Sequence, residues 1–234
     1  MPSLILFPVP IGADDIQMSL PEYNRQLLNT CRTFVVEDVR TARRNLKRMG
    51  YTAAAFDNCT FYELNEHTKP EDTIHYLDPI TRGENVGVMS EAGLPCIADP
   101  GNLVVAQAQR MGIDVIPLVG PSSIMLALMA SGFNGQNFAF LGYPPIEAAK
   151  RGPFFKHVEQ AVYRDSQTQI FIEAPYRNDK LLDYLARTLQ PTTRICVACD
   201  LTLPTQYVKT QSARHWLQDP PQLHKRPAIF LIYK

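Results

Sequence analysis

Short runs of apolar residues alternate with segments of helical spacing along the first half of the chain. Residues 3–9 and 33–37 are apolar runs of strand length, and a helix can begin between them at Pro21. The segment 40–49 has the pattern of a helix that stops at Gly50. Strands that alternate with helices are typical of a parallel sheet covered on both faces.

The alternation continues as far as residue 119. Apolar runs at 86–89 and 114–119 predict two further strands, and a helix is expected between them at 102–111. A glycine-, proline- and serine-rich turn at 120–123 then opens another helix. We place the domain boundary at this turn, which predicts an N-terminal α/β lobe over 1–119 and a C-terminal α/β lobe over 120–234.

The second half follows a different pattern, because its later strands succeed one another without long helices between them. Helices are expected around 147–163, 177–189 and 211–217. The expected strands are 138–143, 169–173, 194–200, 206–209 and 228–233. The sequence therefore predicts an α/β protein of two lobes, with a mostly parallel first sheet and a mixed second sheet.

The charges balance over the whole chain but cluster in one segment. Lys and Arg together number 23, as do Asp and Glu, so no global basic field exists to attract nucleic acid or an anionic membrane. The one dense basic run falls in the helix expected at 40–49, which contains Arg40, Arg43, Arg44, Lys47 and Arg48. This run is either a solvated helix face or a contact surface for RNA phosphates.

The five cysteines are odd in number and lie mostly in apolar runs, which favours reduced, buried thiols and a cytoplasmic location. Cys196 and Cys199 have the spacing of a redox or zinc pair, but no second pair accompanies them, so a buried strand is the favoured interpretation and no metal site is expected. The N-terminal apolar run is too short and proline-rich for a signal peptide, and no run is long enough to span a bilayer.

Small and polar residues follow four of the expected strands, at 8–12, 90–93, 120–123 and 173–175. Ligands of open parallel sheets bind beyond the carboxyl ends of the strands, so these four turns together predict a ligand site. Each turn alone is a weak signal, since any strand-to-helix turn needs such residues. Neither GxxxxGK[ST] nor GxGxxG occurs, which disfavours a Walker NTPase and a dinucleotide dehydrogenase.

These turns, with the acidic and basic residues at 37–40 and the segment 173–177, resemble the tetrapyrrole methylase superfamily. Within it they are most similar to the branch that methylates small-subunit ribosomal RNA. The resemblance covers nearly the whole chain in order. It implies an S-adenosylmethionine-dependent methyltransferase and a homodimer, with the cofactor in a cleft between two lobes. It further implies 2'-O-methylation of ribosomal RNA in the 30S subunit.

The same resemblance implies a set of cofactor contacts. They are Pro10, Ser90, Glu91, Ala92, Gly93, Ser122, Ser123, Ile172, Ala198, Pro227 and Ala228. The chain departs from the usual pattern of the branch at four positions. Glu91 stands in place of Asp, Ala13 of Asn, Leu94 of Thr and Ala174 of Ser.

Methyl transfer to a hydroxyl requires alignment of donor and acceptor and removal of the hydroxyl proton. Glu37, Asp38 and Arg40 end the second expected strand on the edge that carries the cofactor turns, which makes them candidates for handling the acceptor. The alternative is that they form a salt-bridged loop that orders the helix at 40–49. Glu173 and Arg177 can likewise form a simple ion pair within their loop.

Two other functions remain open from the sequence. The first is a tetrapyrrole methylase that acts at carbon on a corrinoid precursor, which uses the same cofactor site and needs no basic helix. The second is a non-catalytic homologue that binds the cofactor or RNA, which the departures at Glu91 and Ala174 suggest.

Overall fold

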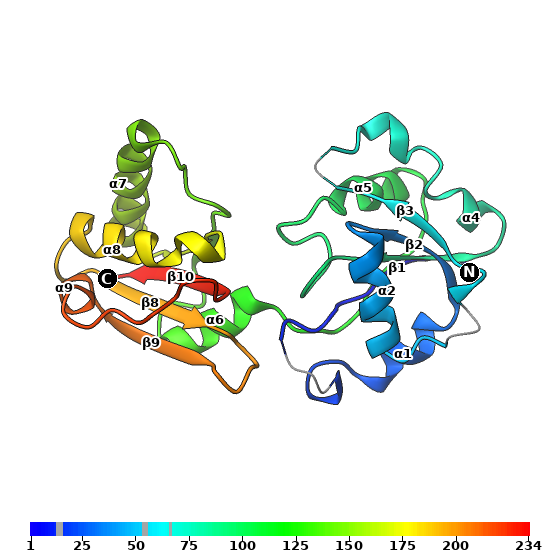
Figure 1. Cartoon of the computed structure of the whole chain (residues 1–234). Helices are drawn as coiled ribbons and strands as arrows, with labels where there is room; N and C mark the ends of the chain where they lie inside the picture. Colours follow the sequence, from blue (N-terminus) through cyan, green and yellow to red (C-terminus); the bar gives the residue numbers. More distant parts are fainter. Residues whose placement is uncertain (13–15, 53–55, 66) are drawn as a thin grey trace. The chain divides into compact units, whose positions relative to one another are not determined.

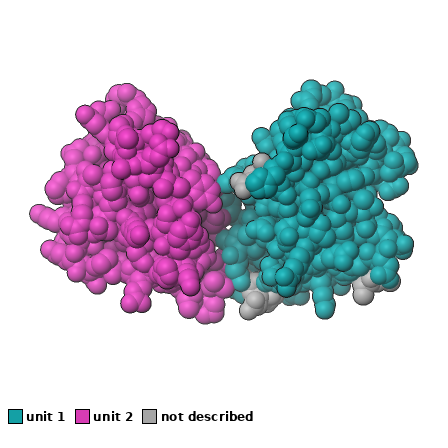
Figure 2. Space-filling model, turned by 45° about the horizontal axis from the view of Figure 1, so that its top comes forward, with its two compact units in different colours: residues 1–122 teal, residues 123–234 magenta. Residues whose placement is uncertain are grey.

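A computed structural model describes residues 1–12, 16–52, 56–65 and 67–234. The chain divides into two compact units, residues 1–122 and residues 123–234 (Figures 1 and 2). The sequence places the division after Val119, within the same turn. Among the described residues, no helix has both the length and the apolar character needed to cross a membrane.

The first unit is built on a sheet whose strands all run parallel. In spatial order its strands are β3 (Thr60–Glu63), β2 (Cys31–Val36), β4 (Asn85–Met89), β1 (Leu4–Leu6) and β5 (Val115–Pro117). The parallel first sheet is thereby confirmed. Every strand therefore points its carboxyl end to the same edge, and the loops that leave the strands gather there.

Helices cover both faces of this sheet (Figure 1). One face carries η1 (Ile16–Met18), α1 (Glu22–Leu28) and α2 (Val39–Arg48). The other carries η2 (Pro70–Thr73), α4 (Asp78–Thr81) and α5 (Asn102–Arg110). Leu28 and Leu46 pack with Phe34 on the first face, whereas Val104 packs with Val88 on the second. These contacts fix α2 against the sheet.

The second unit contains a mixed sheet, as predicted. Its strands, in spatial order, are β6 (Phe138–Phe140), β7 (Thr168–Ile172), β10 (Ala228–Tyr233), β8 (Arg194–Cys199) and β9 (Tyr207–Ser212). Only β6 and β7 pair in parallel, and the other neighbours are antiparallel. The short connections of the late strands produce this pattern, because parallel neighbours need a crossover.

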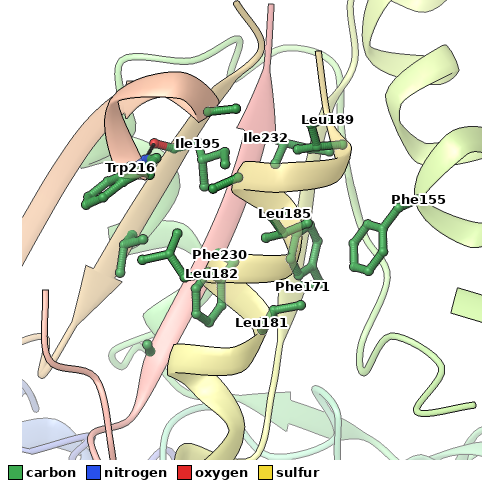
Figure 3. Close-up of a cluster of buried hydrophobic side chains, with 14 of the residues drawn as sticks. Phe155, Phe171, Leu181, Leu182, Leu185, Leu189, Ile195, Trp216, Phe230 and Ile232 are labelled. Carbon is green, nitrogen blue, oxygen red and sulfur yellow. Dashed lines mark hydrogen bonds between the residues drawn. The ribbon is translucent and has the colours of Figure 1, made fainter. Parts of the chain in front are cut away.

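One face of the second sheet packs against α7 (Ala148–Asp165), α8 (Asn178–Thr188) and α9 (Ala213–Trp216), and η3 (Pro175–Arg177) precedes α8. Figure 3 shows the aromatic and leucine side chains of this core, in which the Nε1 of Trp216 donates to the carbonyl of Ile195 at 3.0 Å. The other face is covered by α6 (Ser123–Ser131), whose last carbonyl accepts from the hydroxyl of Thr210 at 2.8 Å.

Among the described residues of the first unit, four elements have no counterpart among those that the sequence predicts, namely η1, β3, η2 and α4. The strand β3 is short and lies at the edge of the sheet, and its first and last residues, Thr60 and Glu63, are exposed. It therefore lacks the continuous apolar run that marks the inner strands. The helix α4 contains only four residues, too few to show a helical period.

Candidate active site

Three loops meet at the carboxyl edge of the first sheet. The amide of Val9 donates to the carbonyl of Gly93 at 2.9 Å, and the amide of Gly93 donates back to the carbonyl of Val9 at 3.0 Å. A Cβ added at Gly120 would overlap the ring of Pro8, so only glycine allows the third loop to approach this closely. Three of the turns singled out in the sequence thus lie together in one unit.

The loop 90–93 is held by polar contacts that leave two of its side chains exposed. The buried hydroxyl of Ser90 donates to the carbonyl of Ala92 at 3.2 Å. Asn45, which is buried on α2, donates its amide to the carbonyl of Glu91 at 3.1 Å. The side chains of Glu91 and Ala92 are exposed. The structure therefore fixes the backbone of this loop while presenting a carboxylate and a methyl group to solvent.

Two carboxyl groups pair beside this loop. Glu37 follows β2, accepts a hydrogen bond from the amide of Glu91, and lies within hydrogen-bonding reach of Asp99. Partial burial and then the negative charges of Asp99 and Glu91 raise the pKa of Glu37 to about 7. Burial also raises the pKa of Asp99, which hydrogen-bonds Ser90. At neutral pH this site therefore both holds and releases a proton.

Asp99 reaches Glu37 through an unusual loop conformation. Cys96 and Ala98 have φ values of 68° and 66°, in the left-handed region that residues other than glycine seldom adopt. The sequence pattern assigns Asp99 only to the turn that precedes the helix at 102–111. No local signal predicts two such residues, so sequence reasoning misses Asp99 as a member of the site.

A small cavity adjoins the paired carboxyl groups. It has a volume of about 10 Å³, and Glu37, Ser90, Cys96 and Asp99 are among the residues that line it. This is room for about one water molecule. Burial raises the pKa of the Cys96 thiol to about 11, so this side chain is a neutral thiol at physiological pH. Most of the other lining residues are apolar, so the two carboxyl groups are the proton acceptors of this small cavity.

The other two catalytic candidates have different surroundings. Asp38 caps α2, and its Oδ1 accepts from the amide of Thr41 at 2.7 Å. This hydrogen bond lowers the pKa of Asp38 below its ordinary value. Arg40 is exposed in the first turn of α2. The capping hydrogen bond explains why Asp38 stands at the start of α2. Glu37 does not cap the helix, so helix formation alone does not account for its position.

The predicted RNA-binding residues form a single exposed stripe on α2. We call the set the basic stripe, and it comprises Arg40, Arg43, Arg44, Lys47 and Arg48. Their spacing places them on one side of the helix, opposite the buried Ala42 and Leu46. The guanidinium group of Arg43 lies 5.3 Å from the centre of the Phe61 ring on β3. The stripe starts two residues beyond the candidate catalytic carboxylate Asp38.

The second unit gathers its own predicted cofactor contacts at one end of its sheet. Ile172 and Ala198 lie opposite Ile229 on its two sides, in one row across β7, β10 and β8. Ala228 is the residue before Ile229 in β10. The carbonyl of Pro227 accepts a hydrogen bond from the amide of Asp200 at 3.0 Å. Ser123 opens α6 in this unit, whereas Ser122 is the last residue of the first unit.

An ion pair holds the loop after β7. The carboxylate of Glu173, whose side chain is 3% exposed, accepts from the Nε and Nη2 of Arg177 at 2.9 and 2.5 Å. The same oxygen accepts from the amide of Ala174 at 2.8 Å. One oxygen of this carboxylate thus accepts three hydrogen bonds, and the carboxylate also raises the pKa of Arg177. The geometry matches an ion pair that orders the loop.

The structure also places the two spaced cysteines and one further position at which the chain departs from the pattern of the branch. Cys196 and Cys199 are both buried in β8, and their spacing directs them to opposite faces of the sheet, which excludes the zinc or redox pair. Leu94 is half-buried in the loop that follows Gly93. Ala13, the remaining departure, lies outside the described residues. Within the part of the chain that is described, no three acidic, cysteine or histidine side chains are placed to hold a metal ion.

Curated relatives share sequence with most of this chain. It is 26% identical to the ribosomal RNA small subunit methyltransferase I of Vibrio cholerae, over 99% of this chain and 77% of the relative. It is 34% identical to the protein of that name from Pseudomonas aeruginosa, over 79% of this chain and 60% of the relative. For the Escherichia coli O157:H7 protein of that name, the identity is 29% over 85% and 65%. The chain thus spans about two thirds of the length of such relatives.

Solved structures of methyltransferases share the fold. The methyltransferase CobJ matches with a TM-score of 0.65 and 14% identity, over 100% of this chain and 95% of the other. A uroporphyrin-III C-methyltransferase from Thermus thermophilus matches with a TM-score of 0.56 and 15% identity, over 99% and 94%. The sequence profile described as Tetrapyrrole (Corrin/Porphyrin) Methylases matches residues 20–215, well over half of the chain. The chain therefore belongs to the tetrapyrrole methylase family, which confirms the resemblance seen in its motifs.

Proposed function

We propose that this protein is an S-adenosylmethionine-dependent methyltransferase that methylates a ribose 2'-hydroxyl of small-subunit ribosomal RNA. The observation that carries this proposal is the pairing of Glu37 with Asp99 beside loop 90–93 and at the start of the helix that bears the basic stripe. A proton acceptor, a predicted cofactor loop and a phosphate-binding surface thus occur together in one unit. A hydroxyl acceptor on RNA needs all three.

The carboxyl edge of the first sheet suits a cationic ligand. Glu37, Glu91 and Asp99 bring three carboxyl groups close enough to affect each other's charge. The sulfonium of S-adenosylmethionine is positively charged, and opposite charges attract strongly at short distance. When bound, the cofactor supplies an activated methyl group. Loop 90–93 supplies the fixed backbone and small residues that allow a close approach.

The chain's own residues then have two tasks. The basic stripe holds the RNA backbone and so orients the acceptor ribose. The carboxylate of Glu37 would accept the proton of the 2'-hydroxyl, which would leave the hydroxyl oxygen able to take the methyl group that the bound cofactor would supply. A base with a pKa of about 7 suits this task, because about half of it is deprotonated at neutral pH and the carboxylate still binds a proton well. Asp99 and Ser90 orient it.

The RNA substrate is supported by two independent observations. The basic stripe is exposed and continuous along α2. The curated relatives named above carry the name of a ribosomal RNA small subunit methyltransferase. From the same resemblance we infer a homodimer and a cytoplasmic location, and light scattering at micromolar concentration tests the first of these inferences.

The test is a transfer assay with labelled donor on purified 30S subunits. We expect methylation of ribosomal RNA, and mass spectrometry of the digested RNA places the methyl group on a ribose oxygen. Unmodified RNA together with accumulated corrinoid precursors in a deletion strain would instead favour methylation at carbon of a tetrapyrrole. Cofactor binding without turnover on 30S subunits would favour a non-catalytic homologue.

A charge-removal variant tests the basic stripe separately. The triple variant Arg43→Gln, Arg44→Gln, Lys47→Gln should reduce the slope of log affinity for RNA against log salt by about two to three units, because each lost phosphate contact contributes about 0.7–0.9. The matched control removes three exposed positive charges from the second unit, at Lys156, Lys180 and Arg187. If the triple variant had the same salt slope as the control variant, the stripe would be only a solvated face.

A further inference from the structure

A groove lies on the surface of the first unit, lined by residues at the start of α1 and at the end of α2. Its volume is about 780 Å³, within the range of ligand sites. The residues that matter for its chemistry are Leu20, Pro21, Asn24, Arg25, Arg48 and Met49. None of them belongs to the predicted cofactor or catalytic set, and only Arg48 belongs to the basic stripe.

The groove has buried apolar residues beneath it and the cation of Arg25 beside it. Leu20 and Met49 are 7% and 3% exposed, so both are anchored in the core beneath it. Gly50 has a φ of 84°, and a Cβ there would lie 2.7 Å from the Nε of Arg25. Glycine at this position therefore lets the guanidinium of Arg25 lie directly on the backbone at the end of α2. A flat cation beside apolar side chains is a surface on which a planar ring can stack.

The charges around the groove favour a ligand that carries both a negative charge and a planar ring. Arg25 from α1 and Arg48 from α2 both line it, and Glu22 is the acid among the lining residues that the structure describes. The pair of Arg25 with Glu22 spans 3.7 Å between side chains that are 58% and 65% exposed. An ion pair this exposed contributes little, so Arg25 can give up its contact with Glu22 at small cost when a nucleotide binds.

The groove is also continuous with the basic stripe. Arg48 is the last residue of the stripe and a wall of the groove. Arg40, at the other end of the stripe, is eight residues away, which is about 12 Å along a helix. This length allows more than one phosphate of an extended single strand to contact the stripe. A strand that follows the stripe away from the catalytic edge therefore arrives at the groove.

We propose that this groove binds one unstacked nucleotide of single-stranded RNA that flanks the methylated ribose. Its phosphate contacts Arg48, and its base stacks on the guanidinium plane of Arg25 over Leu20 and Met49. Such stacking on arginine and apolar side chains is how proteins bind unpaired bases. The proposal rests on the RNA substrate proposed above, and it adds a second subsite that fixes which stretch of RNA reaches Glu37.

The experiment compares Arg25→Gln with a matched control, Arg82→Gln. Arg82 is also in the first unit and 60% exposed, and it pairs weakly with Glu84 at 4.0 Å. The probes are short single-stranded RNAs that carry 2-aminopurine at successive positions. In the wild type, emission should rise at one position, where the base leaves the stack of its neighbours. Arg25→Gln should lose this signal and bind RNA about tenfold more weakly, whereas Arg82→Gln should match the wild type.

Two additional measurements separate the possible failures. Arg25→Lys keeps the charge but loses the planar group, so it should also lose the emission signal. Cofactor affinity and melting temperature should be unchanged in all three variants, which excludes unfolding as the cause. If the wild type binds and methylates RNA but Arg25→Gln behaves in the same way, the groove proposal is wrong and the proposed function stands. If the wild type binds no RNA, or an acidic peptide displaces the probe from the groove more readily than unlabelled RNA does, the groove proposal is also wrong.

Discussion

Glu37 and Glu173 occupy similar places in the two units but have opposite electrostatic surroundings. Each follows the last residue of an inner strand, β2 or β7, and each is shielded from water to some degree. Glu37 faces the carboxyl groups of Asp99 and Glu91. Glu173 faces the guanidinium of Arg177, which donates two hydrogen bonds to it. One carboxyl group is surrounded by like charge and the other by opposite charge.

The difference teaches that position at a strand end does not by itself assign a role. Partial burial, and then the like charge of its neighbours, raises the pKa of Glu37 to about 7, so this group can exchange a proton during a reaction at neutral pH. The guanidinium of Arg177 and the amide of Ala174 hold the carboxyl group of Glu173 in one orientation, so Glu173 acts as a fixed structural group. In the sequence, only the neighbouring residues distinguish Glu37 from Glu173. Those neighbours do not indicate that Asp99 lies beside Glu37.

The largest expected effect is on catalysis at Glu37. Replacement by Gln removes the proton acceptor while keeping the shape, and we expect kcat to fall by about 10²–10⁴ with little change in the affinity for S-adenosylmethionine. Single-turnover transfer to 30S subunits and calorimetry measure the two quantities. The matched variant Glu173→Gln should leave kcat within a few-fold of wild type. A comparable loss of kcat in both variants would remove the distinction between the two glutamates.

The second effect is a loss of stability, and it concerns Glu173 and its partner Arg177. Arg177→Met leaves the carboxylate of Glu173 buried without its partner, which should reduce the free energy of unfolding by about 3 kcal/mol. Urea denaturation measures the change. In the double variant Glu173→Gln, Arg177→Met, a large part of the loss should return, because no unpaired charge remains. A single variant as stable as the wild type would contradict the structural role of this pair.

The third effect is a pH dependence that only the first unit should show. With a base of pKa about 7, the rate at pH 6 should be about one tenth of its plateau at alkaline pH. Asp99→Asn removes a negative charge from beside Glu37, so the midpoint of the pH–rate profile should move to lower pH. A midpoint that stays at the wild-type value would show that Asp99 does not act on the catalytic group.

The same raised pKa has a consequence for folding with a definite sign. The folded protein binds the proton of Glu37 more tightly than the unfolded chain, whose carboxyl group has an ordinary pKa of 4.5. This group therefore stabilises the fold fully below pH 4.5, and its contribution is lost as the pH rises from 4.5 to about 7. Asp99→Asn should make the unfolding free energy vary less over this interval.

The sequence predicted the elements that carry strong periodicity. The strands at 86–89 and 228–233 and the helices at 40–49 and 102–111 match β4, β10, α2 and α5 closely. Buried central strands and amphipathic helices have hydrophobic patterns that remain recognisable when single residues depart from them. The edge strand β5 ends at Pro117, whereas its apolar run continues to residue 119, and beyond the strand the amide of Leu118 still donates to the carbonyl of Leu6 at 3.1 Å.

The candidate site was only partly predictable. Glu37 and loop 90–93 were identified because parallel strands deliver their carboxyl ends to one edge. The link from Glu37 to Asp99 depends on the left-handed conformations of Cys96 and Ala98, which the packing of the unit imposes and which those residues do not prefer alone. The groove beside Arg25 depends on the meeting of α1 and α2, which no local pattern encodes.

The hydrogen bond from Asn45 to the carbonyl of Glu91 has a thermodynamic consequence. It joins the helix that carries the basic stripe to the loop predicted to bind the cofactor. A ligand that shifts α2 by binding to the stripe also changes the position of the loop, and a ligand in the loop changes α2. Linkage requires that any such influence be equal in both directions. If RNA tightens the binding of the donor through Asn45, the donor must tighten the binding of RNA by the same factor.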